Sequence, residues 1–180
     1  GDPGDMGGGG VCIMDSNPSF IDVEISNNQT DDLGGGIFLH QSSDSPINLF
    51  NVTVVNNHAN EGGGIYYMDA FSINPVMINS IVWGNTAVNY GPNIYADYLG
   101  GCYDANGYQS SVCDALDPEE CYLAGCEWIN DYGLLVSISN IQGGYEGEEN
   151  IDSNPLYTDP ENGDYRLSWE NYPTEDETMS

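Results

Sequence analysis

The residues of this 180-residue chain that could take part in acid–base chemistry are almost all acidic. Asp and Glu total 29 against a single Lys or Arg, which gives a formal net charge of -28. That one cation is Arg166. A lyase acting on acidic polysaccharide needs a cationic base and further cations to hold the uronate groups, so lyase activity is disfavoured. Nucleic acids are excluded as partners because no basic patch can form, and anionic membrane surfaces are disfavoured for the same reason.

Glycoside hydrolysis is a second reaction that acidic side chains could catalyse. It needs two carboxyl groups about 5 to 9.5 Å apart, and an acidic chain can supply such a pair by accident. Asp31-Asp32 has no Gly-His-Gly phrase beside it and is interpreted as a solvated turn. His40 and His58 have no Ser or Cys partner at a suggestive spacing, and both are expected to be exposed. We therefore assign no catalytic residue and lean away from an enzyme.

Calcium is the metal that the sequence favours. Asp159, Glu161 and Asp164 are closely spaced around Gly163 and offer the oxygen ligands that Ca2+ prefers. The distant Glu and the full spacing of an EF-hand loop are missing. An acidic turn without a metal is the alternative, and no motif requires a cofactor.

Four cysteines lie close together at Cys102, Cys113, Cys121 and Cys126. Their spacings of 11, 8 and 5 match no zinc ribbon or finger, and no His accompanies them. Two disulfides are expected, with the pairing left open and a zinc site as the alternative. Cys12 is left over, either packed as a small apolar residue or free on a strand face. Disulfides favour an extracellular or cell-surface location.

The sequence contains an internal repeat, which predicts the secondary-structure elements that position these residues. Three glycines precede each of Val11, Ile37 and Ile65, and a degenerate copy, Gly91-Pro92-Asn93, precedes Ile94. These apolar residues are separated by 26, 28 and 29 positions. A second phrase keeps the same period. It is a run rich in β-branched residues that ends in Asn27-Asn28, Asn56-Asn57 and Gly84-Asn85. Two landmarks with one period indicate a repeated structural unit.

Each unit is rich in Gly, Asn and β-branched residues, which favours short strands over helices. Ile37 and Leu39 would point one way and Phe38 the other, as in a half-buried strand. One unit cannot bury its apolar face alone, whereas stacked units can, with each strand pairing in parallel with its counterpart at ~4.8 Å. The sequence therefore predicts a parallel β-solenoid of about four coils with a dry interior.

Two rows of equivalent side chains follow from that stacking. Asn28, Asn57 and Asn85 should form an internal amide ladder at corners that need a left-handed backbone, with ordinary exposed turns as the alternative. An outward aromatic stripe should join three rings of successive coils, as a surface for sugar rings or a partner. These rings are Phe38, Tyr66 and Tyr95. The alternative is that the Cys-rich insertion or a neighbouring subunit covers the stripe.

The repeated wording, Asn-Asn followed by Gly-Gly-Gly-Ile and Phe or Tyr over residues 8 to 97, resembles the right-handed parallel β-helix repeat proteins of pectin-lyase-like fold. Residues 151–167 look like the closing rung common in such proteins. The resemblance implies a right-handed β-helix found in secreted and surface proteins of bacteria, and it says nothing about activity. In relatives the tail continues into a Ser-Pro-Cys-Ile-Asp-like phrase, which this chain lacks.

Three regions are expected. Residues 1–97 form β-helix coils, residues 98–132 a disulfide-rich insertion, and residues 133–180 the last coil and closing segment. Within the last region, residues 139–141 echo residues 50–52. No apolar run approaches 18 residues, so no transmembrane helix is expected, and the opening residues lack the pattern of a signal peptide.

The expected function is that of a non-catalytic extracellular structural or adhesive segment. It would belong to a larger surface protein or associate end to end with other copies, because the first residues resemble the last corner of a preceding coil. The alternative is a carbohydrate-binding or glycoside-hydrolysing module.

Overall fold

The computed structural model describes residues 7–41, 46–69, 74–97, 101–103, 127–129 and 134–168. The described chain is all-β, and its strands form three parallel sheets and two antiparallel pairs. The elements are β1 (Val11–Met14), β2 (Ser19–Ser26), β3 (Ile37–Gln41), β4 (Asn48–Val55), β5 (His58–Glu61), β6 (Ile65–Asp69), β7 (Val76–Ile78), β8 (Ile81–Trp83), β9 (Thr86–Tyr90), β10 (Ile94–Asp97), β11 (Gly101–Tyr103), β12 (Glu127–Ile129), β13 (Leu135–Ser137), β14 (Asn140–Ile141), β15 (Tyr157–Asp159), the 3-10 turn η1 (Pro160–Asn162) and β16 (Asp164–Leu167).

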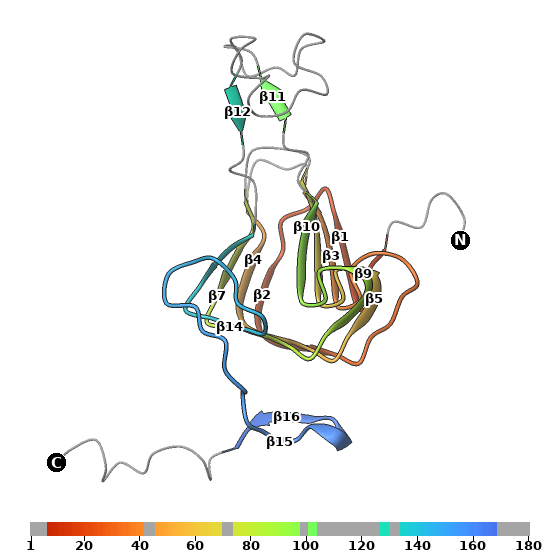
Figure 1. The fold of residues 1–180 in the computed structure, drawn as a ribbon, viewed down its shortest axis with the longest axis vertical. Coiled ribbons are helices and arrows are strands. Elements are labelled where there is room, and N and C mark those ends of the chain that lie inside the picture. Colours follow the sequence, from red (N-terminus) through yellow and green to blue (C-terminus); the bar gives the residue numbers. More distant parts are fainter. Residues whose placement is uncertain are drawn as a thin grey trace, which may run out of the picture.

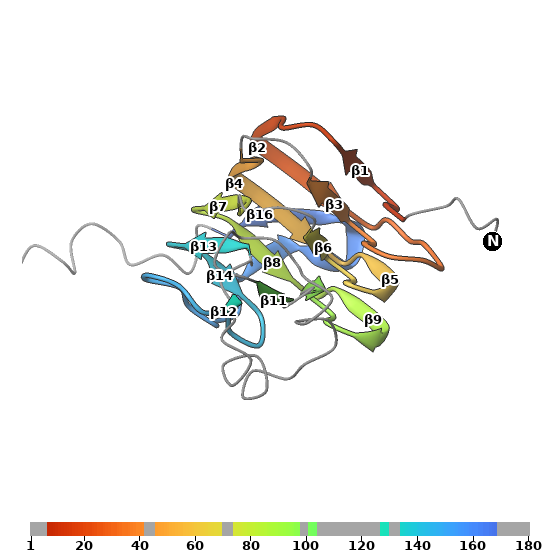
Figure 2. The same cartoon turned by 90° about the horizontal axis from the view of Figure 1, so that it is seen from above.

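The chain visits the three parallel sheets in a repeating order. Sheet A contains β1, β3, β6 and β10, sheet B contains β2, β4, β7, β8, β13 and β14, and sheet C contains β5 and β9. The strands β3, β4 and β5 pass through sheets A, B and C in turn, and the chain from β6 to β9 repeats that order. Figure 1 shows sheets A and B as two facing walls, with sheet C on the outer side of sheet A, and Figure 2 shows the strands of each wall side by side.

The register of sheet A follows the repeat in the sequence. Val11 pairs with Ile37, Ile37 with Ile65, and Ile65 with Ile94, all in parallel. The predicted pairing of equivalent residues is therefore confirmed. The side chain of Phe38 points to the opposite face from those of its neighbours in the strand, as the alternation of apolar residues predicts.

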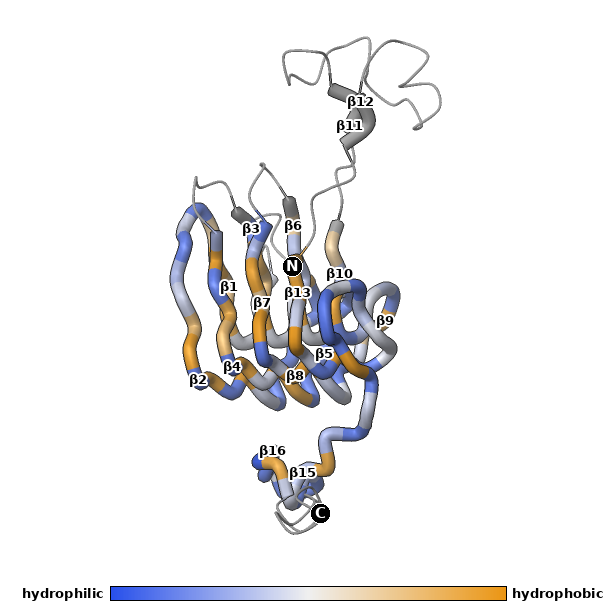
Figure 3. Tube along the Cα trace, turned by 90° about the vertical axis from the view of Figure 1, so that its left-hand side faces the viewer, coloured by the Kyte–Doolittle hydropathy of each residue, from blue (hydrophilic) through white to orange (hydrophobic). Residues whose placement is uncertain are grey.

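The apolar core lies between sheets A and B. Ile37, Leu39 and Tyr67 of sheet A are fully buried in it, as are Leu49 and Val54 of sheet B. Burying one such side chain stabilises the fold by about 1.5 to 3 kcal/mol. Figure 3 shows the hydrophobic segments along the stacked strands and the hydrophilic ones at the turns between them. Each repeat thus contributes one layer to a shared interior.

The last repeat differs from the prediction in its register. Ser139 aligns with Ser80 and Val52, because Ser137 pairs with Ile78 and Ile78 with Phe50. The predicted echo between residues 139–141 and residues 50–52 is therefore two residues out of register. A shift of two leaves every side chain on the same face, so alternation alone could not detect the error.

The tail also departs from the expected closing rung. Ile151 forms a single bridge to Asn140, but β15 and β16 pair with each other as an antiparallel hairpin. Tyr165 of the hairpin donates a hydrogen bond from its hydroxyl to Oδ1 of Asn27, at 3.0 Å. The hairpin therefore reaches back to the second sheet of the first repeat instead of stacking on the last one. Across the described ranges, no helix has the length and apolarity needed to cross a membrane.

Candidate functional site

A row of asparagine side chains runs along the inside of the repeats. Nδ2 of Asn28 donates to Oδ1 of Asn57 at 3.0 Å, and Nδ2 of Asn57 donates to Oδ1 of Asn85 at 3.0 Å. The backbone N–H groups of Asn28 and Asn57 donate to the same oxygens, at 2.9 and 2.8 Å. Asn57 is 1% exposed and Asn85 4% exposed. The row thus satisfies amide groups that would each cost about 1 to 3 kcal/mol if buried without a partner.

The left-handed corner falls one residue earlier than expected. Asn27 has a φ of 58° and Asn56 a φ of 54°, and Gly84 occupies the same place at 66°. The first residue of each pair therefore makes the turn, and the second points inward to form the ladder. Asn and Gly tolerate this backbone conformation best, which explains why the pairs read Asn-Asn and Gly-Asn.

The ladder ends on a residue of the degenerate fourth copy of the glycine phrase. Oδ1 of Asn93 accepts from the backbone N–H and the Nδ2 of Asn85, at 3.3 and 3.1 Å. Asn93 stands where the other copies have Gly64, Gly36 and Gly10, immediately before the first residue of the strand. Its Nδ2 donates to the carbonyl of Gln142 at 2.9 Å. The change from Gly to Asn at this position supplies the missing rung.

A second, shorter row in sheet B ends in the same manner. The backbone N–H of Val52 donates to Oγ of Ser80, and that of Ser80 donates to Oγ of Ser139. The N–H of Ser139 then donates to Oδ1 of Asn150, at 3.0 Å. Residues 142–151 therefore close the end of the stack that faces away from β1 and β2.

The predicted aromatic stripe exists as a stack of rings, but most of it is buried. The rings of Phe38 and Tyr66 lie 5.7 Å apart, and those of Tyr66 and Tyr95 5.4 Å apart. Phe38 is 0% exposed and Tyr66 2% exposed, so the prediction of an open binding surface is wrong for these two. Sheet C lies against this face, and Tyr90 of β9 stacks on Tyr95 at 5.9 Å. Gly62, with a φ of 61°, lies in the turn that connects β5 of sheet C to β6 of sheet A.

The residues expected to bind calcium lie in the hairpin. Asp164 is held by Arg166, whose Nε and Nη2 donate to its two carboxylate oxygens at 2.8 and 2.6 Å. These hydrogen bonds lower the pKa of Asp164 to about 2. Oδ2 of Asp159 accepts from Nδ2 of Asn162 at 2.8 Å. In the part of the chain that the structure describes, no three His, Cys, Asp or Glu side chains are grouped to hold a metal ion, and the calcium site, which includes Glu161, stays a prediction.

The hairpin rests on the protein through two tyrosines. Tyr157 and Tyr165 meet edge to face with ring centroids 5.4 Å apart, and Tyr165 is 6% exposed. The hydroxyl oxygen of Tyr157 is buried and has no hydrogen-bond partner in the described structure. Burial raises the pKa of the Tyr157 phenol above its ordinary value, and the negative charge of Glu24 raises it further.

The predicted disulfides fall almost entirely outside the described residues. Cys113, Cys121 and Cys126 are not described, and Cys102 is described only as part of the backbone of β11, where it pairs with Trp128 of β12. The disulfides and their pairing therefore stay predictions. Cys12, the fifth cysteine, is a free thiol on the exposed side of β1.

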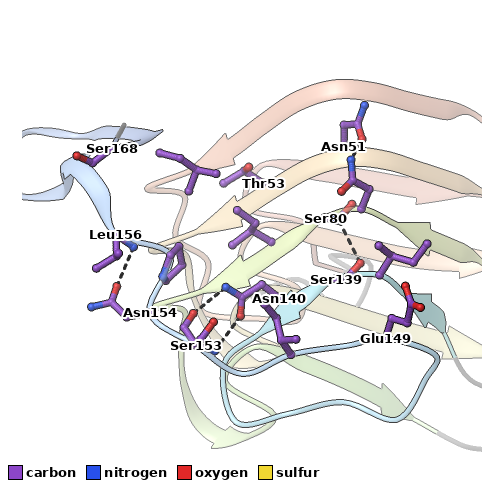
Figure 4. A pocket seen from close by; sticks show the side chains of 16 residues that line it. Asn51, Thr53, Ser80, Ser139, Asn140, Glu149, Ser153, Asn154, Leu156 and Ser168 are labelled. Atoms are coloured by element: carbon purple, nitrogen blue, oxygen red, sulfur yellow. Dashed lines mark hydrogen bonds between the residues drawn. The ribbon is translucent and has the colours of Figure 1, made fainter. Parts of the chain in front are cut away.

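A cavity lies where the last repeat meets the start of the tail (Figure 4). It has a volume of about 620 Å3. Asn51 and Thr53 of β4 line one side, and Glu149, Ile151 and residues 153–156 line the other. Asn140 ties the two together, because its Nδ2 donates to the carbonyl of Ser153 at 2.7 Å and its Oδ1 accepts from the N–H of that residue at 3.1 Å.

The cavity combines amides with exposed aliphatic side chains. Glu149 is the only charged residue among those described residues that line it. Four of its aliphatic side chains are among the most exposed apolar groups of the described chain: Ile138 at 53%, Ile151 at 55%, Leu156 at 45% and Leu167 at 36%. The sequence did not predict this site, because its walls come from sheet B and from a tail whose path the repeat does not specify.

Comparison with known proteins adds no assignment. No protein-family model matches the chain, and neither a curated protein nor a solved structure is significantly similar to it.

Proposed function

We propose that this chain is a segment of a right-handed parallel β-helix that acts as a non-catalytic scaffold at the cell surface or outside the cell. One observation carries the proposal: residues one repeat apart satisfy each other's hydrogen bonds, in the strands and in the asparagine ladder. Connections between parallel strands of one sheet are nearly always right-handed, which supports the proposed hand. The pectin-lyase-like resemblance of the repeats supports the same interpretation.

The two ends of the stack differ, and this bears on assembly. Asn93 and Asn150 close one end by accepting the last ladder hydrogen bonds. At the other end, β1 pairs only with β3 and β2 only with β4 within the described residues. Head-to-tail filaments would need the closed end to accept a strand. The asymmetry therefore favours association through the β1–β2 edge, with the same edge of a second copy as the partner.

Sedimentation equilibrium of the purified chain, over a range of protein and salt concentrations, tests this mode of assembly. We expect a monomer at low salt, because two copies that each carry a charge of -28 repel each other. Added salt screens that repulsion and should allow nothing larger than a dimer. Growth of long filaments would contradict the closed end.

Surface location is tested on intact cells that produce the protein. A membrane-impermeant carboxyl label should modify the chain, which has 29 Asp and Glu residues and no Lys, without cell lysis. Non-reducing mass spectrometry should find Cys102, Cys113, Cys121 and Cys126 oxidised in two pairs. Labelling only after lysis, with four reduced thiols, would overturn the extracellular assignment.

A carbohydrate module is the second candidate, and one observation favours it. Tyr90 is 61% exposed at the end of the aromatic row and stacks on Tyr95, so a sugar ring could pack on its outer side. A glycan array followed by a hydrolysis screen distinguishes the candidates. Sugar binding that Tyr90→Ala removes, or hydrolysis that one Asp or Glu substitution abolishes, would favour the carbohydrate module over the scaffold.

A further inference from the structure

The cavity beside the last repeat collects the most strained backbone of the described chain. Ile138, Glu149 and Leu156 have φ values of 51°, 55° and 55°, and all three line the cavity. Every other non-glycine residue with positive φ in the described ranges is Asp or Asn, the types that tolerate this conformation. For a β-branched residue such as Ile138 it is an outlier. Strain of this kind persists only where the surrounding structure holds it, and it gathers at binding and catalytic sites.

Ile138 is also a departure from the repeat. It lies opposite Asn79, which lies opposite Asn51, and those two side chains are hydrogen bonded to each other. An Asn at position 138 would continue the row at lower conformational cost. The backbone N–H of Ile138 instead donates to the carbonyl of Glu148 at 2.8 Å, which fixes the strained turn. The result is a 53% exposed aliphatic side chain at the wall of the cavity.

The chemistry of the walls defines the ligand. The apolar part is aliphatic, and the described lining has no aromatic ring on which a sugar could stack. The single charge is the Glu149 carboxylate, which has no hydrogen bond or ion pair within the described structure, on a protein whose net charge is -28. Such a site repels anions and attracts cations. Amides such as those of Asn79 and Asn154 can bond to a peptide backbone.

We propose that this cavity binds a short extended peptide segment in which a Lys or Arg is flanked by aliphatic side chains. The cation pairs with Glu149, and the aliphatic groups pack against Ile138 and Leu156. The volume of about 620 Å3 is within the range of small-ligand sites. This inference goes beyond the scaffold role and does not depend on it, because it rests on the geometry of the cavity alone.

The test uses three capped tripeptides as probes, titrated into the 15N-labelled full chain and followed by NMR. Acetyl-Leu-Lys-Leu-amide carries both features, acetyl-Leu-Gln-Leu-amide lacks the cation, and acetyl-Ser-Lys-Ser-amide lacks the aliphatic groups. We expect saturable shifts for the first peptide, confined to residues around the cavity, and about fivefold weaker binding for each of the others. High salt should reduce the difference between the Lys and Gln peptides.

Matched variants assign the binding to this cavity. Glu149→Gln should weaken binding of the Lys peptide about fivefold without affecting the Gln peptide, whereas Glu148→Gln, one residue away, should leave both unchanged. Ile138→Asn should weaken both Leu-containing peptides and raise the melting temperature by about 3 °C, because strain is released. Val88→Asn, which removes a 67% exposed aliphatic side chain from β9, is its control.

The outcomes separate clearly. Loss of binding in Glu149→Gln and Ile138→Asn, with the control variants intact, supports the proposal. Absence of saturable binding by the Lys peptide overturns it, as does binding that Glu149→Gln leaves unchanged. If Ile138→Asn fails to fold, the pair of Glu variants still decides the question.

Discussion

Asn93 Oδ1 accepts two hydrogen bonds from Asn85, which lies only eight residues before it in the chain. Asn57 makes the same two donations to Asn85, across 28 residues. The ladder therefore ends on Asn93, in the fourth copy of the glycine phrase. Its side chain takes the place of a fourth ladder asparagine. A position that is Gly in three copies becomes Asn in the fourth because the rung beyond it is missing.

Asn93→Gly restores the wording of the other copies and should destabilise the protein. Nδ2 of Asn85 keeps its bond to the carbonyl of Val54, but its second hydrogen and the backbone N–H of Asn85 lose their acceptor, which costs about 1 to 3 kcal/mol in the free energy of unfolding. Hydrogen exchange should show faster exchange of the Asn85 backbone amide. Unchanged exchange at that amide would mean that Asn93 does not cap the ladder.

Asn57→Ala tests the ladder at its most buried rung. Asn57 accepts two hydrogen bonds from Asn28 and donates to Asn85 and to the carbonyl of Ile25. Its loss should reduce the free energy of unfolding by about 3 kcal/mol, measured by urea denaturation. Asn89→Ala is the control, because Asn89 makes one exposed bond to Asn60 and should cost less than about 0.5 kcal/mol. Equal losses in the free energy of unfolding for the two variants would mean that the ladder hydrogen bonds of Asn57 do not stabilise the fold more than one exposed hydrogen bond does.

Gly36→Ala tests the close approach of successive repeats. A Cβ at Gly36 would lie 2.6 Å from the carbonyl oxygen of Gly64 and 3.0 Å from Nδ2 of Asn57. Both atoms are fixed, so the layers must separate, at a cost of about 3 kcal/mol. Gly143→Ala is the comparison: its φ is 88° but its Cβ meets nothing within 4 Å, so only about 1 kcal/mol of conformational strain is expected. Urea denaturation of the two variants should separate steric exclusion from backbone strain.

The docking of the hairpin should depend on pH through Tyr157. Burial keeps this phenol neutral in the folded protein and raises its pKa above the unfolded value of about 10. Below pH 10 the docking free energy is fully present, and it falls as the pH rises, because only the undocked tyrosine ionises readily. NMR signals of the Tyr165 ring report the docked state.

Tyr157→Phe provides the control for that titration. Because the buried hydroxyl has no partner in the described structure, its removal should be neutral or should stabilise the hairpin by about 1 kcal/mol or less. The loss of docking above pH 10 should disappear in this variant. The same loss in the variant would assign the effect to another group.

The repeat predicted what local chemistry can decide. The period aligned Ile37 with Ile65 and Asn28 with Asn57, since parallel stacking forces equivalent residues together, and the alternation of apolar residues told the inner face from the outer one. The same pattern could not choose between registers two residues apart, so the place of Ser139 came only from the structure.

Burial of the outer face depended on elements that the pattern does not place. Phe38 and Tyr66 face outward from sheet A, as expected, but both are buried, and sheet C lies on this side of sheet A. The tail likewise left the stack, because Tyr157 and Tyr165 bury their rings by folding back on the protein. The cavity lined by Ile138 and Glu149 forms only because the tail follows this path, since tail residues such as Leu167 line its other side. The sequence by itself determined which residues repeat and pair, because those contacts recur at one period; the tertiary structure alone decided which surfaces are covered, because that depends on segments that occur once.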